Sequence, residues 1–198
     1  MKVAIKRLRL HLGERQGFGR FHPNECNIWS MLDHVNILPL LGFVQEGKAY
    51  ALVSEWMEDG TLCEYLQNRI RCPIEDIILG IANGVDYLHG QNLVHCNLKA
   101  DKILINSLGK PLICGFGNSR KLQIPYVRTF EGLEESIRWM AYKLFDFSGD
   151  RHHTKESDVW AFGMTVYEIL SKQLPYAHLE NNAVVFCTIF GRYAKSVG

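Results

Sequence analysis

The order of strand-like and helix-like patterns along the chain is its most constraining feature. Residues 3–7, 37–43 and 50–55 have the short apolar stretches that predict strands. The stretch from about 21 to 32 carries apolar residues at helical spacing, so a helix is expected between the first two strands. From Gly60 onward helical patterns dominate. This order predicts an α+β fold with a small strand-rich part and a larger helical part.

Two long helices are predicted in the larger part. Residues 74–88 have a strong apolar face, and Gly90 is a plausible C-terminal cap. Residues 158–171 are apolar all round, which predicts a helix surrounded by protein on every side. The remaining predicted elements are two short strands and a final helix, at residues 102–105, 111–114 and 181–194.

Three short motifs follow one another at a characteristic spacing: Val3-Ala4-Ile5-Lys6, His95-Cys96-Asn97-Leu98-Lys99 and Gly115-Phe116-Gly117. They stand where protein kinases carry Val-Ala-Ile-Lys, His-Arg-Asp-Leu-Lys and Asp-Phe-Gly. Ser157-Asp158-Val159-Trp160-Ala161-Phe162-Gly163 matches the start of the central helix of the kinase large lobe. Pro175-Tyr176 follows as in tyrosine-kinase-like members. The chain therefore resembles the eukaryotic protein kinase family, in a degenerate form.

The resemblance implies a protein kinase-like two-lobed fold of the α+β class. We expect a single partial domain over residues 1–198, with 1–57 as a small-lobe remnant and 58–198 as a large-lobe portion. Because the lysine motif begins at Val3, the expected small lobe lacks its first two strands and the glycine-rich loop between them. The expected large lobe, which is mainly helical, lacks its last helices.

The resemblance also implies which residues would contact a nucleotide. Lys6 is placed to hold phosphates, and Glu25 is the carboxylate that would orient its ammonium group. Ordinary surface charge is the alternative for both residues, and the ordered motifs downstream argue against it. The other implied contacts surround an adenine: Ala4 and Leu104 on its two faces, Ser54 at the gatekeeper position, and the backbone of Glu55 and Met57.

The catalytic residues of the family are largely replaced. Asn97 stands at the position of the catalytic base, and a neutral amide cannot accept a proton usefully at pH 7, whereas a positioned base contributes roughly 10²–10⁴-fold in rate. Lys102 and Gly115 stand at the two magnesium-ligand positions, and magnesium demands oxygen ligands. Cys96 replaces the arginine that pairs with a phosphorylated segment. Lys99 of the catalytic loop is retained.

The structural frame of the family is better preserved. Asp158 is placed to hold the backbone of the catalytic loop. Lys143 replaces a glutamate and cannot make the ion pair which that glutamate makes in the family. Four residues occupy the positions of the regulatory stack of side chains, although core packing alone would also explain their apolar character: Trp29, Leu40, His95 and Phe116.

These observations predict a pseudokinase, a catalytically impaired kinase-like domain that serves as a protein-binding or scaffold module. Two alternatives stay open: a weakly active ATP-dependent Ser/Thr or Tyr kinase that uses Lys6 and Lys99, and a nonfunctional fragment of a kinase gene. The expected cofactor is none, or weakly bound ATP without magnesium, and the expected partners are other proteins. A net charge of +1 gives no reason to expect nucleic acid or membrane as a partner. Six irregularly spaced cysteines and no signal sequence favour a cytoplasmic location.

Overall fold

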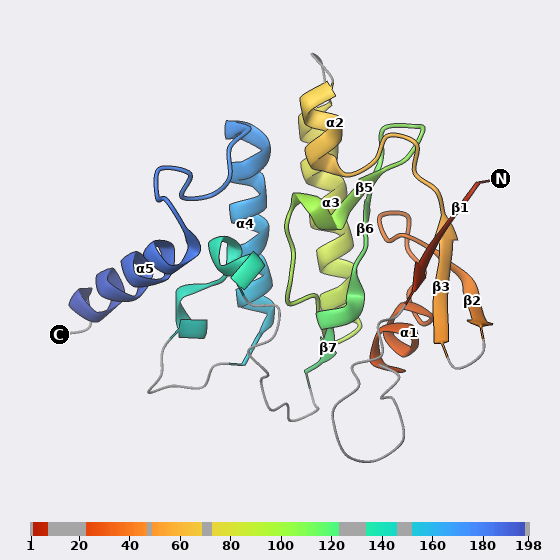
Figure 1. Cartoon of the computed structure of the whole chain (residues 1–198), viewed down its shortest axis with the longest axis horizontal. Helices are drawn as coiled ribbons and strands as arrows, with labels where there is room; N and C mark the ends of the chain where they lie inside the picture. The colour runs from red at the N-terminus through yellow and green to blue at the C-terminus, as the bar shows by residue number, and fades with distance from the viewer. Residues whose placement is uncertain are drawn as a thin grey trace.

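The computed structural model describes residues 2–7, 23–46, 49–68, 73–122, 134–145 and 152–196. Figure 1 shows a small sheet with one short helix at one side of the molecule and the longer helices in the middle and at the other side. Strands come first and helices dominate later, so the predicted α+β class is confirmed. No helix among the described residues is both long and apolar enough to cross a membrane.

In the described part of the chain, the small sheet contains three antiparallel strands in the order β1-β3-β2, namely β1 (Val3–Arg7), β3 (Ala49–Glu55) and β2 (Leu40–Glu46). Its register sets Ala4 opposite Ser54 and Lys6 opposite Leu52. Between the first two strands of the chain lies α1 (Pro23–Trp29), within the stretch where the sequence predicts a helix. The side chains of Ala4 and Lys6 point to the same side of β1, because strand residues alternate between faces.

The second strand begins at Leu40, three residues later than the pattern predicts. Ile37 instead forms an isolated parallel bridge with Ile113, and the backbone N of Leu38 donates to the carbonyl of Ile113 at 2.9 Å. The residues before β2 therefore tie the small sheet to the larger part of the molecule. Tertiary pairing has overridden a local strand pattern here.

Within its described residues, the larger part contains four helices, four short strands and four 3-10 turns. In chain order they are α2 (Leu62–Asn68), α3 (Ile74–Gly90), β4 (Leu93–Val94), η1 (Ala100–Lys102), β5 (Ile103–Ile105), β6 (Pro111–Ile113), η2 (Phe116–Asn118), β7 (Arg120–Lys121), η3 (Glu134–Trp139), η4 (Tyr142–Phe145), α4 (Lys155–Ser171) and α5 (Asn182–Ser196). β4 pairs with β7, and β5 pairs with β6. Gly90 is the last residue of α3 rather than its cap, and Asn92 takes the left-handed backbone conformation instead.

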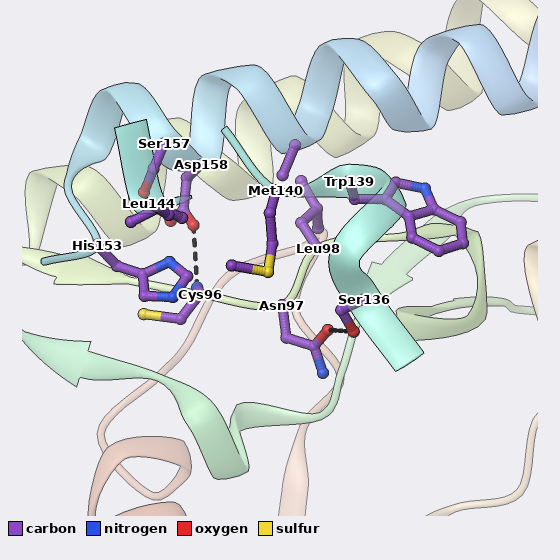
Figure 2. A pocket seen from close by; sticks show the side chains of 11 residues that line it. Cys96, Asn97, Leu98, Ser136, Trp139, Met140, Leu144, His153, Ser157 and Asp158 are labelled. Atoms are coloured by element: carbon purple, nitrogen blue, oxygen red, sulfur yellow. Dashed lines mark hydrogen bonds between the residues drawn. The ribbon is translucent and has the colours of Figure 1, made fainter. Parts of the chain in front are cut away.

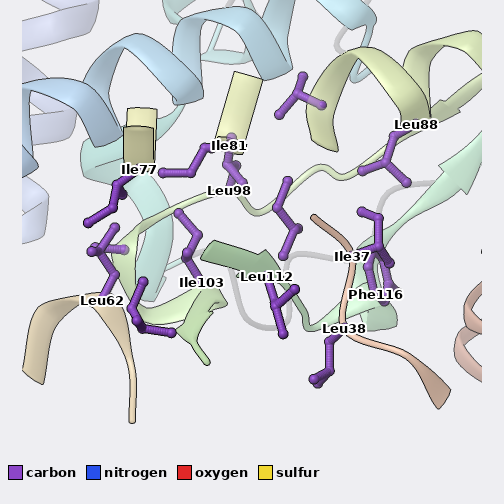
Figure 3. Close-up of a cluster of buried hydrophobic side chains, with 14 of the residues drawn as sticks. Ile37, Leu38, Leu62, Ile77, Ile81, Leu88, Leu98, Ile103, Leu112 and Phe116 are labelled. Carbon is purple, nitrogen blue, oxygen red and sulfur yellow. The ribbon is translucent and has the colours of Figure 1, made fainter. Parts of the chain in front are cut away.

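The main core lies between α3 and the β5–β6 hairpin (Figure 3). Ile77, Ile81 and Leu88 of α3 are almost fully buried. Two glycines on the same helix allow this close approach: a Cβ on Gly80 would lie 2.6 Å from Cγ of Pro111, and a Cβ on Gly84 would lie 2.7 Å from Cδ1 of Ile113. Larger residues at these glycines would push the helix away from the hairpin that carries several of the predicted site residues.

α4 is not surrounded by protein on every side, so that prediction is wrong within the part of the chain that the structure describes. Thr165 and Ile169 are fully buried, whereas Val159 is 56% and Leu170 64% exposed. The helix therefore has one face in the core and one apolar face in solvent. An apolar pattern shows that a face can be buried, but it cannot show that a neighbour is present to bury it.

Candidate functional site

An open pocket of about 510 Å³ lies where β1 and the segment after β3 meet the larger part of the molecule. Ala4 of β1 and Leu104 of β5 both line it, as do Glu55 and Met57 from the end of β3 and the segment after it. Four residues that the sequence assigns to an adenine site therefore meet in one pocket. The lining continues through Gly60 and Thr61 to the first turns of α2. A concave site with mixed apolar and polar lining is typical of small-molecule binding.

Ser54, the residue at the gatekeeper position, does not line this pocket. It is buried within β3, and its hydroxyl donates weakly to the carbonyl of Glu55 at 3.4 Å. Ser54 therefore lies beside the pocket, opposite Ala4 in the strand register.

Lys6 and Glu25 form an ion pair, with Nζ of the lysine 2.5 Å from Oε1 of the glutamate. The two partners differ in burial: 52% of the Lys6 side chain is exposed, against 6% of the Glu25 side chain. Glu25 also lies against the glycine motif, since a Cβ on Gly117 would be only 3.2 Å from its Oε2. The ion pair thus links β1, α1 and the segment after β6, while the lysine keeps an exposed side.

Three aromatic side chains stack between the small sheet and the catalytic loop. The rings of Trp29 and Phe116 lie 6.0 Å apart, and those of Phe116 and His95 lie 5.6 Å apart in an edge-to-face arrangement. Phe116 and His95 are fully buried. Leu40 is partly buried and packs against the same core. Three of the four predicted stack residues are therefore in direct contact, as the resemblance implies.

Asp158, at the start of α4, holds the catalytic-loop backbone. Its carboxylate accepts hydrogen bonds from the backbone N of His95 at 2.6 Å and of Cys96 at 2.9 Å. Cys96 has a positive φ of 66°, a conformation that these two bonds help to maintain. Burial lowers the pKa of His95, although the Asp158 charge opposes the shift. The buried imidazole is therefore neutral near pH 7.

The side chain of Asn97 accepts a hydrogen bond from another residue of the chain (Figure 2). The hydroxyl of Ser136, in η3, donates to Oδ1 of Asn97 at 2.5 Å. Lys99 is buried, and its Nζ lies 5.4 Å from the centre of the Trp139 ring, within cation–π range. The sequence analysis did not identify Ser136 as a site residue. The signal in the sequence was the position of Ser136, three residues before Trp139 in a segment that resembles the kinase family.

The two magnesium-ligand positions contain no oxygen ligand. Gly115 adopts φ of 83°, and a Cβ placed there would be 3.0 Å from Cδ of Lys102. The aliphatic part of Lys102 therefore fills the space beside Gly115. No group of three or more His, Cys, Asp or Glu residues that could hold a metal occurs among the described residues. The chemistry of Lys102 and Gly115 does not fit a magnesium ion.

Glu168, a residue that the sequence reasoning missed, fixes three segments around the catalytic loop. Its Oε2 accepts from Trp139 Nε1 at 3.0 Å and from the backbone N of Ala100 at 3.2 Å, and its Oε1 accepts from the Cys63 thiol at 3.4 Å. Burial raises the pKa of the Glu168 carboxyl, and burial together with the Glu168 charge raises the pKa of Cys63 to about 12. The available signal in the sequence was a carboxylate within the apolar stretch that follows Asp158, because Glu168 is the one acidic residue of α4 after Asp158.

Lys143 contacts the start of α4. Its ammonium donates to Oγ1 of Thr154 at 2.6 Å and lies 3.7 Å from Glu156. Thr154 caps the helix, because its hydroxyl accepts from the backbone N of Ser157 while Ser157 bonds back to the backbone N of Thr154. The lysine that replaces a glutamate thus has a local partner at a helix N-terminus.

Arg138 makes three hydrogen bonds to the segment between α4 and α5 and one to the first residue of α5. Its guanidinium donates to the carbonyls of Pro175, Tyr176 and Leu179 at 2.8–3.2 Å and to Oδ1 of Asn182 at 3.0 Å. A second small core is formed by buried residues of η4, of α5 and of the short link between η3 and η4, with Ile137 of η3 packed against it. This part of the chain is therefore firmly attached to the catalytic-loop side of the molecule.

Comparison with known proteins agrees with this geometry. A family model described as protein tyrosine and serine/threonine kinase matches residues 1–194. The chain is 34% identical over 190 residues to ephrin type-A receptor 5 of Gallus gallus. This alignment covers 92% of the present chain and 18% of the receptor. It is 33% identical over 194 residues to ephrin type-B receptor 1-A of Xenopus laevis, covering 93% of this chain and 19% of that receptor. The chain spans less than a fifth of the length of these relatives. With the ordered motifs, the ion pair and the aromatic stack, these matches show that the chain belongs to the protein tyrosine and serine/threonine kinase family.

Proposed function

We propose that this chain is a pseudokinase domain, which does not transfer phosphate and which acts by binding other proteins. The observation that carries the proposal is the joint replacement of the base and both metal ligands. Asn97, Lys102 and Gly115 occupy those positions in a fold whose frame is otherwise assembled. Phosphoryl transfer requires the metal to neutralise developing charge and a residue to orient the nucleophile. Each of these functions lacks its residue here.

The chemistry of Asn97 supports the first part of the proposal. Its Oδ1 is an amide oxygen that accepts a hydrogen bond from Ser136 at 2.5 Å. An amide cannot take the proton of a substrate hydroxyl near pH 7. The side chain is thus chemically inert as a base, and its only acceptor atom is already engaged by Ser136.

Exposed apolar side chains support a role in binding proteins. Among the described residues, the small sheet exposes five large apolar side chains, which lie on both of its faces and offer apolar surface to a partner: Val3, Ile5, Leu41, Phe43 and Val44. α4 adds a second exposed group, which includes Val159 and Leu170. A catalytically impaired domain that keeps a folded frame can serve as a binding surface without turnover.

A second candidate is a weakly active ATP-dependent kinase. The Lys6–Glu25 ion pair and the contacts between Trp29, Phe116 and His95 favour it, because both features belong to an assembled kinase frame. One experiment separates the two candidates. The purified chain is incubated with radiolabelled ATP, generic protein substrates, and magnesium or manganese.

We expect no transfer above the level of a Lys6→Ala variant. Transfer that exceeds this control and depends on the metal would overturn the pseudokinase proposal and favour the weak kinase. The triple variant Asn97→Asp, Lys102→Asn, Gly115→Asp is the matched positive control, because it restores a carboxylate base and two oxygen ligands in the same frame.

A further inference from the structure

Two lysines lie close in sequence to residues that line the pocket described above. Ala4 and Leu104 line that pocket from β1 and from β5. Lys6 lies two residues after Ala4, and Lys102 lies two residues before Leu104. On β1, residues two apart share a face, so Lys6 projects from the same face as Ala4. Lys102 is the last residue of η1 and directly precedes β5, the strand that carries Leu104. Each of the two strands that line the pocket therefore contains or directly follows a lysine.

The charges of both lysines meet around Cys114. Burial raises the pKa of the Cys114 thiol to about 11, while Lys102 and Lys6 both act to lower it and Glu25 acts to raise it. The backbone N of Cys114 also donates to the carbonyl of Lys102 at 2.9 Å, which places the two residues side by side. Lys102 lies against Gly115, and Glu25, the partner of Lys6, lies against Gly117, so both lysines are connected to the same short segment.

Lys102 is free to bind an anion. Among the described residues no carboxylate lies within ion-pair distance of it. Its aliphatic part is held against Gly115, with Cδ 3.0 Å from the position of a Cβ there. A lysine whose stem is fixed loses less side-chain entropy when its ammonium binds a ligand. Lys6 is paired with Glu25 but remains half exposed, so its ammonium has further donors available.

We propose that Lys102 and Lys6 together bind the phosphates of a nucleoside di- or triphosphate without a divalent cation. Lys102 then supplies the positive charge that a metal ion supplies elsewhere in the family. A bound magnesium ion cancels part of the negative charge of the nucleotide and holds waters that need space. Magnesium therefore weakens the binding or leaves it unchanged. The inference concerns the same site as the pseudokinase proposal but rests on binding rather than on turnover.

Calorimetric titration of the full 198-residue chain with ATP tests it, once with EDTA and once with excess magnesium. We expect binding in EDTA that magnesium does not strengthen. A Lys102→Met variant should bind ATP about tenfold more weakly or worse, the scale of one lost charge-assisted hydrogen bond. The same variant should bind adenosine, which has no phosphate, as the unchanged chain does.

Lys110→Met is the matched control, because Lys110 is an exposed lysine at the other end of the β5–β6 hairpin. It should leave ATP binding unchanged. Thermal unfolding of each variant checks that it is folded. The magnesium comparison on the unchanged chain needs no variant, so a misfolded mutant would not prevent the test.

Three results would overturn the inference: ATP binding that requires magnesium, a folded Lys102→Met variant that binds ATP as tightly as the unchanged chain, or no ATP binding by the folded chain. A double variant Lys102→Asn, Gly115→Asp gives the converse test. Removing the lysine stem opens space for the new carboxylate, and Asp tolerates the left-handed backbone better than most residues. This variant should bind ATP more tightly with magnesium than without it. The pseudokinase proposal fails only if phosphate is transferred, so the two can fail separately.

Discussion

The hydroxyl of Ser136 donates a hydrogen bond of 2.5 Å to Oδ1 of Asn97, so a residue of η3 occupies the acceptor atom at the base position. A carboxylate at residue 97 would accept the same bond, because the donor is a hydroxyl. The surroundings of Asn97 therefore suit an aspartate in geometry, although the sequence supplies an amide.

This geometry predicts that Asn97→Asp alone is folded and inactive. The restored carboxylate can act as a base, but Lys102 and Gly115 still provide no oxygen ligand for a metal. A radiolabelled transfer assay should detect nothing above the Lys6→Ala control. Metal-dependent transfer by the single variant would show that other residues hold the metal.

Removing either partner of the Lys6–Glu25 pair should have unequal effects. Lys6→Met leaves the buried Glu25 carboxylate without its cation, whereas Glu25→Gln leaves a half-exposed lysine that water can solvate. We expect Lys6→Met to cost about 1–3 kcal/mol in the free energy of unfolding and Glu25→Gln to cost less. Urea unfolding of both variants and of the double variant measures this. Equal costs would mean that Glu25 is solvated in the folded state.

Glu168 should make stability depend on pH in a direction opposite to that of most carboxylates. Its pKa in the folded chain is raised above the ordinary value of 4.5, so the folded state binds a proton more tightly than the unfolded state. The contribution of this group is therefore full below pH 4.5 and is lost as pH rises through the raised pKa. Unfolding midpoints measured from pH 4 to pH 7 should fall less steeply in Glu168→Gln than in the unchanged chain. Parallel pH profiles would contradict the prediction.

The isolated chain should self-associate through its small sheet. β1 lies at an edge of the three-stranded sheet within the described residues, and its Ile5 is 57% exposed. Ile5→Ser should reduce the apparent mass at high concentration in size-exclusion chromatography with light scattering. Leu108→Ser is the control, because Leu108 is 79% exposed in the turn between β5 and β6, which lie outside the three-stranded sheet. A monomer at every concentration, with one cooperative urea transition, would show that the sheet is self-sufficient.

Much of the fold could be predicted because motifs and periodic patterns report local structure. The strand at Val3–Arg7 and the helix at Ile74–Gly90 lie where apolar spacing places them. The start of β2 could not be predicted, because the residues before it pair with Ile113, which is distant in sequence. The exposed face of α4 could not be predicted either, since burial depends on a neighbour that a local pattern does not describe.

The candidate site also combines residues that the sequence could predict with contacts that it could not. The residues at the nucleotide positions could be named because motif order places them, and the pocket contains Ala4 and Leu104. The hydrogen bond of Ser136 and the role of Glu168 depend on segments that meet only in the folded chain. No spacing rule connects Cys63 with Glu168, which are 105 residues apart.

The hydrogen bonds between Arg138 and the α4–α5 connection determine which sequence changes this connection can tolerate. Three of its four hydrogen bonds reach main-chain oxygens, those of Pro175, Tyr176 and Leu179. The guanidinium thus recognises the course of the backbone and not the chemistry of the side chains along it. Substitutions at the exposed positions of this connection should leave these hydrogen bonds intact. Adding or deleting one residue would instead displace several of the carbonyl groups that accept them. The length of the connection, more than its composition, therefore keeps α5 in place.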